Sequence, residues 1–90
     1  PAMNVIIIEH ARERMAERGV SEQEVQAVLK AGAPRDERHG RYAKERVFEF
    51  SGKWHGRPYP EKKVRVIYVE EAEARVVITV YAFYGNWGEE

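Results

Sequence analysis

The chain of 90 residues contains no cysteine. This absence excludes disulfide bonds, thiol catalysis and cysteine-coordinated zinc. Long apolar runs are missing too, because no segment approaches the roughly 20 residues that a membrane-spanning helix requires. Residues 1–8 also lack the length and basic flank of a signal peptide. We therefore expect no membrane association, and the cytoplasm is the simplest location for the protein.

Common catalytic motifs are absent as well. The sequence has no phosphate-cradling glycine loop, no Gly-x-Ser-x-Gly motif and no paired-carboxylate signature. Its three histidines, His10, His39 and His55, lack the spacing of metal ligands. We therefore predict no metal site and no cofactor.

The composition predicts one small domain. Hydrophobic residues make up 43% of the chain and charged residues 33%, enough for a single core beneath a well-solvated surface. We assign this domain to residues 3–90, because Pro1 and Ala2 before Met3 resemble an expression scar.

The net charge is zero, but it is unevenly distributed. Residues 35–65 carry ten basic and five acidic side chains, a balance of +5, whereas residues 1–34 and 66–90 sum to −1 and −4. A basic middle segment points to an anionic partner. The alternative is a pair of strands with ordinary charged edges.

The N-terminal third predicts a helical hairpin. Helical spacing places Ile8, Ala11 and Met15 on the core side of a helix over residues 9–18, which ends at Gly19. Ser21 and Glu24 have the spacing of a capping box and begin a second helix. This second helix buries Val25, Val28 and Leu29 and ends at Gly32 and Pro34.

The remaining sequence predicts strands. Residues 44–50, 63–70 and 75–84 have strand patterns, separated by polar or Gly- and Pro-rich loops at 35–43 and 51–60. Residues 4–8 are either a first strand or an apolar lead-in to the helix. The last strand is apolar on both sides, which is typical of a central strand. We therefore predict an α+β fold in which the helical hairpin packs on one face of a three- to four-stranded antiparallel sheet. The other face is open, or is covered by the loops or by a second copy of the chain.

Three pieces of the chain resemble the DUF4258 family of small bacterial proteins. They are a histidine-led helix with arginines at four-residue steps, the Gly-Val-Ser link at residues 19–21 and the strand segment Ile-Thr-Val-Tyr at residues 78–81. This family looks like a relative of the RelE/ParE toxins. That resemblance implies two helices on an antiparallel sheet, cleavage of messenger RNA in many members, and a cognate antitoxin as partner. It brings no assigned catalytic residues.

The first candidate site lies on the first helix. RNA cleavage by the 2′-hydroxyl needs a base, an acid and a cation beside the phosphate. His10 suits proton transfer, and Arg14 and Arg18 suit phosphate binding from the same side of the helix. The alternative is that His10 simply opens the helix and that the arginines pair with nearby glutamates.

The second and third candidate sites lie on the sheet and its loop. Arg46 and Arg65 on neighbouring strands, with Tyr81 or Tyr84, would form a basic, aromatic floor for stacked bases. Tyr81 and Tyr84 are also candidates for proton transfer. The loop contributes its own basic and aromatic side chains, Lys53, Trp54 and Arg57. The alternatives are core tyrosines with solvent-facing arginines, and a Trp54 tucked under the sheet or into a dimer contact.

These patterns favour a toxin-type, metal-independent endoribonuclease or an RNA-binding domain. RNA, an antitoxin protein and a second copy of the chain are the expected partners. The alternative is a non-enzymatic interaction module whose aromatic C-terminal strand and tail form a homodimer or partner interface.

Overall fold

The computed structural model describes residues 4–35, 39–50 and 52–87. The expected expression scar at residues 1 and 2 lies outside these ranges. The elements are β1 (Asn4–Ile7), α1 (Glu9–Arg18), α2 (Glu22–Ala31), β2 (Ala33–Arg35), β3 (Tyr42–Glu49), β4 (Lys53–Trp54), β5 (Arg57–Pro58), β6 (Glu61–Glu71) and β7 (Ala74–Gly85).

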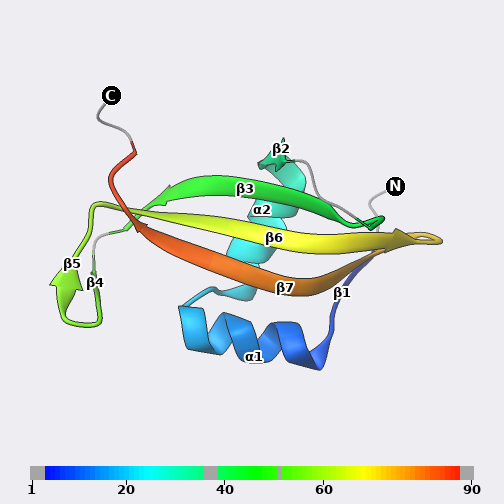
Figure 1. Ribbon diagram of the computed structural model, residues 1–90, viewed down its shortest axis with the longest axis horizontal. Coiled ribbons are helices and arrows are strands. Elements are labelled where there is room, and N and C mark those ends of the chain that lie inside the picture. The colour runs from blue at the N-terminus through cyan, green and yellow to red at the C-terminus, as the bar shows by residue number, and fades with distance from the viewer. Residues whose placement is uncertain (1–3, 36–38, 51, 88–90) are drawn as a thin grey trace.

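Five strands form the main sheet, in the order β1-β7-β6-β3-β2. The central strands are antiparallel, and both helices lie on one side of the sheet (Figure 1). The α+β class is confirmed, but the sheet is larger than predicted and mixed, because β1 pairs with β7 in parallel. The chain enters β2 directly after α2, and β2 is an edge strand, a position that tolerates Pro34.

The helical hairpin forms as its local signals predict. Gly19 ends α1 in the left-handed conformation at φ 72°, and its N–H donates to the carbonyl of Met15. At the start of α2, Ser21 Oγ accepts from the Glu24 N–H at 3.1 Å, while Glu24 Oε1 accepts from the Ser21 N–H at 2.9 Å. The capping box is therefore complete.

The core lies between the helices and one face of the sheet. Its members from the helices include Ala11, Met15, Val25, Val28 and Leu29, all buried as predicted. Ile8 is an exception, with 38% of its surface exposed. It is the N-cap of α1 with extended backbone, so its side chain does not follow the helical phase.

β6, not β7, is the central strand of the sheet. β7 pairs with β6 along its length but with β1 only over residues 74–77. Beyond Val77, the outer edge of β7 has no strand partner among the described residues, and α1 runs alongside it (Figure 1). The described part of the chain contains no helix long and apolar enough to cross a membrane.

The segment predicted as a loop at 51–60 contains a small β-hairpin. β4 and β5 pair through a two-residue turn at His55 and Gly56, whose φ values are 53° and 78°. Two successive positive φ values are typical of a type I′ turn, which suits a tight hairpin. The glycines and prolines that indicated a loop here serve the turn and the strand ends instead.

Candidate functional site

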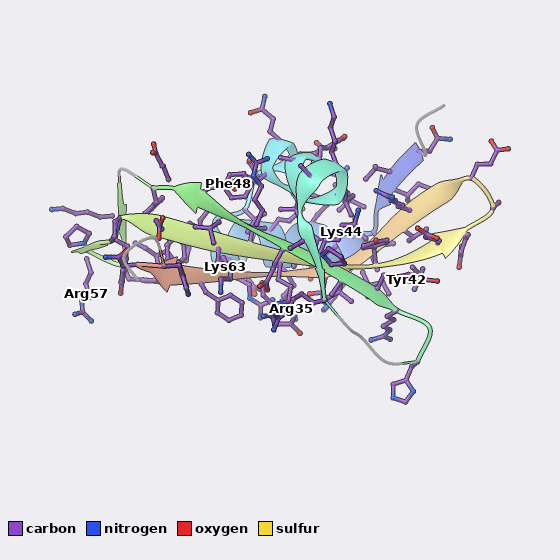
Figure 2. The ribbon with its side chains drawn as sticks, turned by 90° about the horizontal axis from the view of Figure 1, so that it is seen from above. Arg35, Tyr42, Lys44, Phe48, Arg57 and Lys63 are labelled. Carbon is purple, nitrogen blue, oxygen red and sulfur yellow. The ribbon has the colours of Figure 1, made fainter. Side chains whose placement is uncertain are left out.

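The register of the sheet assigns each side chain of β3, β6 and β7 to one of two faces. Cross-strand partners share a face, and successive residues alternate. On the side away from the helices, one row is Glu45, Arg65 and Tyr81, and the next is Val47, Lys63 and Phe83. We call this surface the open face. Figure 2 shows Lys63 on this side, and Lys44 and Phe48 on the side of the helices.

Exposed rings alternate with cations on the open face. Tyr81 and Phe83 are each 39% exposed, and their ring centroids lie 6.5 Å apart with a 20° angle between planes. The Arg65 guanidinium carbon lies 5.2 Å from the Phe83 centroid, and Lys63 Nζ lies 4.7 Å from the Trp87 ring. Such cation–π contacts orient the cations without neutralising them.

A further cation reaches this surface from α1. Arg18 Nη1 donates to the Val80 carbonyl at 2.8 Å, on the outer edge of β7. Its guanidinium carbon lies 5.0 Å from the Tyr81 ring. Arg18 therefore joins the helix layer to the open face around the free edge of the sheet.

The centre of the open face has more positive than negative charge. Glu45 accepts from Arg65 Nε at 2.9 Å and lies 3.9 Å from Arg35 Nε, so two arginines share one carboxylate. Lys63 has no carboxylate partner in the described ranges. The next acids on this face, Glu49 and Glu61, are partners in the last row of the sheet. The excess is therefore positive around Tyr81 and Phe83.

The structure brings together only part of the predicted basic floor. Arg65 and Tyr81 are direct cross-strand partners on the open face. Arg46 pairs with Val64 and lies on the opposite face, 5.2 Å from the Phe48 ring. The expectation that both arginines face the open side is wrong, because the register pairs Arg65 with Glu45 rather than with Arg46.

Tyr84 also lies on the side of the helices. Its hydroxyl donates to the carbonyl of Arg18 at 2.9 Å, and its ring stacks on Trp54 at 4.7 Å. Burial raises the pKa of Tyr84 above its ordinary value, and the nearby Glu24 carboxylate adds to the effect. Of the two candidate tyrosines, only Tyr81 is on the open face.

The row His10, Arg14 and Arg18 on α1 does not converge on one point. His10 is exposed in the first turn, and Arg18 follows it eight positions later, about 12 Å along a helix. Arg14 Nη1 donates to both carboxylate oxygens of Glu17 at 2.9 Å. Arg14 therefore follows the alternative, an ion pair within the helix, and Arg18 alone reaches the sheet.

The loop residues divide into an anchor and an exposed tip. Trp54 is half-buried, and a Cβ added to Gly19 would lie only 2.7 Å from its ring. Lys53 and Arg57 are exposed on the hairpin. Trp54 therefore attaches the hairpin to the helical link, as the tucked alternative expected, and is not available for stacking.

The sequence predictions missed a buried cation beside this anchor. Lys62 is 5% exposed, and its Nζ donates to the Gly19 carbonyl at 2.6 Å and to Glu24 Oε1 at 2.8 Å. The available signal was its phase, because Lys62 alternates in step with the buried Val64 and Val66. Lys63 on the open face was also missed, and Phe83 and Trp87 were expected only as apolar area for this face, because the three residues lie apart in the sequence and only the sheet register brings them together.

The fold and this surface define a small α+β domain with a helical hairpin on one side of a mixed sheet and a basic, aromatic face on the other. Residues 7–82 match the family model described as Domain of unknown function (DUF4258), so the chain belongs to that family. No curated protein and no solved structure matches the chain.

Proposed function

We propose that this domain binds single-stranded RNA on its open face. The observation that carries the proposal is the alternation of two exposed rings, Tyr81 and Phe83, with cations on the same surface. Unpaired bases stack on aromatic side chains, and arginine and lysine bind the phosphates between them. A duplex offers no exposed base faces, so this surface suits single strands.

Each side chain has a role in this proposal. Tyr81 and Phe83 accept stacked bases, and Arg18, Lys63 and Arg65 bind the backbone. Because Arg65 keeps one ion pair with Glu45, its guanidinium is held at a fixed place on the face. Lys63, packed on Trp87, remains free to pair with a phosphate.

Metal-independent cleavage is the second candidate. It is favoured by the position of Tyr81, whose ring lies under Arg18 and whose cross-strand partner is Arg65. In this reaction the 2′-oxygen attacks phosphorus, its proton passes to water, and the leaving 5′-oxygen takes a proton from the Tyr81 hydroxyl. The products are a 2′,3′-cyclic phosphate and a 5′-hydroxyl. His10, some two helical turns from Arg18, would need a substrate that extends along α1.

Fluorescence anisotropy with labelled single-stranded RNA tests the proposal. Loss of a stacking ring costs about 1–3 kcal/mol, so Tyr81→Ala and Phe83→Ala are each expected to weaken binding by about five- to 150-fold. Lys30→Gln is the matched control, because Lys30 is exposed on α2, on the other side of the molecule.

Gel analysis of the same RNA separates binding from cleavage. Tyr81→Phe retains the ring, so it should keep binding and lose any cleavage, and His10→Ala tests the helix site. The proposal fails if wild-type protein does not bind RNA at low salt, or if neither ring affects binding. Self-association without RNA binding would instead support the interaction module.

A further inference from the structure

We infer that the β4–β5 hairpin is a second phosphate-binding element, which extends the RNA path beyond the end of the sheet. This inference rests on the proposed RNA binding at the open face. In this inference the hairpin contacts only RNA strands that are long enough to extend beyond the open face, so its role can be tested separately.

The hairpin is held in a fixed orientation. It projects from the end of the sheet where β6 begins (Figure 1). Trp54 stacks on Tyr84 with a 12° angle between the rings and lies against Gly19. Lys53 lies on the opposite face of the hairpin from the anchoring Trp54, whereas Arg57, the cross-strand partner of Trp54, shares its face, and both charged side chains are exposed. A rigid support of this kind lowers the entropy cost of binding by exposed side chains.

Among the described residues, the charges of the hairpin have no ion-pair partners. Lys53 and Arg57 are exposed, and neither forms an ion pair in the described part of the chain. Residues 52–60 contain no acidic residue. Six other cations of the described ranges form ion pairs, among them Arg12 with Glu22 and Arg14 with Glu17. In a chain with fifteen basic and fifteen acidic residues, an acid-free basic hairpin indicates an anionic ligand.

The hairpin continues the basic surface of the open face. Figure 2 shows Arg57 on the same side of the sheet as Lys63 and Arg35. β5 ends at Pro58 and β6 begins at Glu61, so the chain passes from the hairpin to the Lys63 row within a few residues. A single strand stacked on Tyr81 and Phe83 that continues past Trp87 therefore reaches Arg57.

This geometry makes the hairpin contact dependent on strand length. A strand of about five nucleotides occupies the rows around Tyr81 and Phe83, whereas one of about twelve also reaches the hairpin, within the range of about 4–16 nucleotides known for single-strand sites. The logarithm of the affinity falls linearly with the logarithm of the salt concentration, and each phosphate contact to a single strand makes that slope more negative by about 0.7. Two hairpin contacts therefore steepen that slope by about 1.4 for the longer strand alone.

The experiment measures binding of short and long oligouridylate RNA to three proteins. They are the wild type, the double variant Lys53→Gln/Arg57→Gln and the control Lys30→Gln. We expect the wild type to bind the long strand about tenfold more tightly at low salt. The double variant should bind the long strand more weakly than the wild type does and should lose the extra salt dependence, while its affinity for the short strand stays unchanged. The several registers that a long strand offers favour it equally in all three proteins. Thermal unfolding of each protein checks that the fold is retained.

The possible results separate the two proposals. If the wild type binds neither strand, the open-face proposal fails and the hairpin inference fails with it. If the wild type binds both strands but the double variant matches it on the long strand, only the hairpin inference is overturned. An equal loss on both strands also overturns the inference, because it would place Lys53 and Arg57 in the same contact as the open face.

Discussion

At the scale of single residues, Gly19 combines a backbone requirement with two long-range contacts. Its left-handed backbone ends α1, its carbonyl accepts from the buried Lys62, and its missing side chain makes room for Trp54. Three elements therefore meet on one residue. The sequence indicated only the first of these duties, because a helix-ending glycine is a local signal, whereas its contacts with Trp54 and Lys62 depend on residues more than thirty positions away.

Gly19→Ala is expected to lower the free energy of unfolding by about 2–4 kcal/mol. The left-handed backbone alone costs roughly 1–2 kcal/mol for a residue with a Cβ, and the new Cβ would lie 2.7 Å from Trp54 and 2.9 Å from the Tyr84 hydroxyl. Gly40→Ala is the matched control, since Gly40 has a φ of 76° and no atom of the described residues lies within 4 Å of its Cβ position. Urea unfolding measures both. Equal losses in the two variants would show that the hairpin does not pack on Gly19.

At the scale of elements, the helical hairpin was predictable and the arrangement of the sheet was not. Capping residues and periodicity lie within a few positions of one another, so the bounds of α1 and the capping box of α2 are confirmed. Strand pairing is a long-range property, and a one-residue change of register moves a side chain to the other face. For that reason Arg46 and Arg65, both correctly placed in strands, lie on opposite faces. Likewise, the short β1 and β2 become strands only through their pairing with β7 and β3.

Tyr84 couples β7, the β4–β5 hairpin and α1, and its ionisation should weaken that junction at high pH. Burial raises its pKa in the folded state above the value of about 10 for an unfolded chain. The folded protein therefore holds the phenol proton more tightly than the unfolded chain does. The stability from this proton is complete below about pH 10 and is lost as the pH rises through the raised pKa.

Tyr84→Phe is the variant that tests this junction. It should cost about 1 kcal/mol at neutral pH through the lost hydrogen bond to the Arg18 carbonyl, and it should flatten the decline of stability above about pH 10. Some decline should remain, because burial also raises the pKa of Tyr68. Urea unfolding across the alkaline range measures both effects. An unchanged slope in the variant would contradict the role of Tyr84.

At the scale of the whole molecule, the pleat of the sheet divides the basic middle segment into three surfaces. Lys63 and Arg65 lie on the open face, Lys44 and Arg46 face the side of the helices, and Arg57 belongs to the hairpin. Lys44 donates to the carbonyl of Leu29 at the end of α2, so part of the charge is structural. The sequence therefore predicted the excess of positive charge in this segment but not how the basic residues are distributed over the surfaces, since the pleat places alternate residues on opposite faces of the sheet.

The free edge of β7 is the remaining feature of this scale, because an unpaired strand edge attracts other strands. Arg18 donates a hydrogen bond to the Val80 carbonyl on that edge, and α1 runs beside the edge.

We expect Arg18 to keep the protein monomeric, so Arg18→Ala should dimerise or aggregate as its concentration rises. Arg14→Ala is the control, since Arg14 pairs with Glu17 in the same helix. Sedimentation equilibrium over a wide concentration range measures the difference. A wild-type protein that already dimerises, with no change in the Arg18 variant, would mean that the edge is an interface and that Arg18 does not protect it.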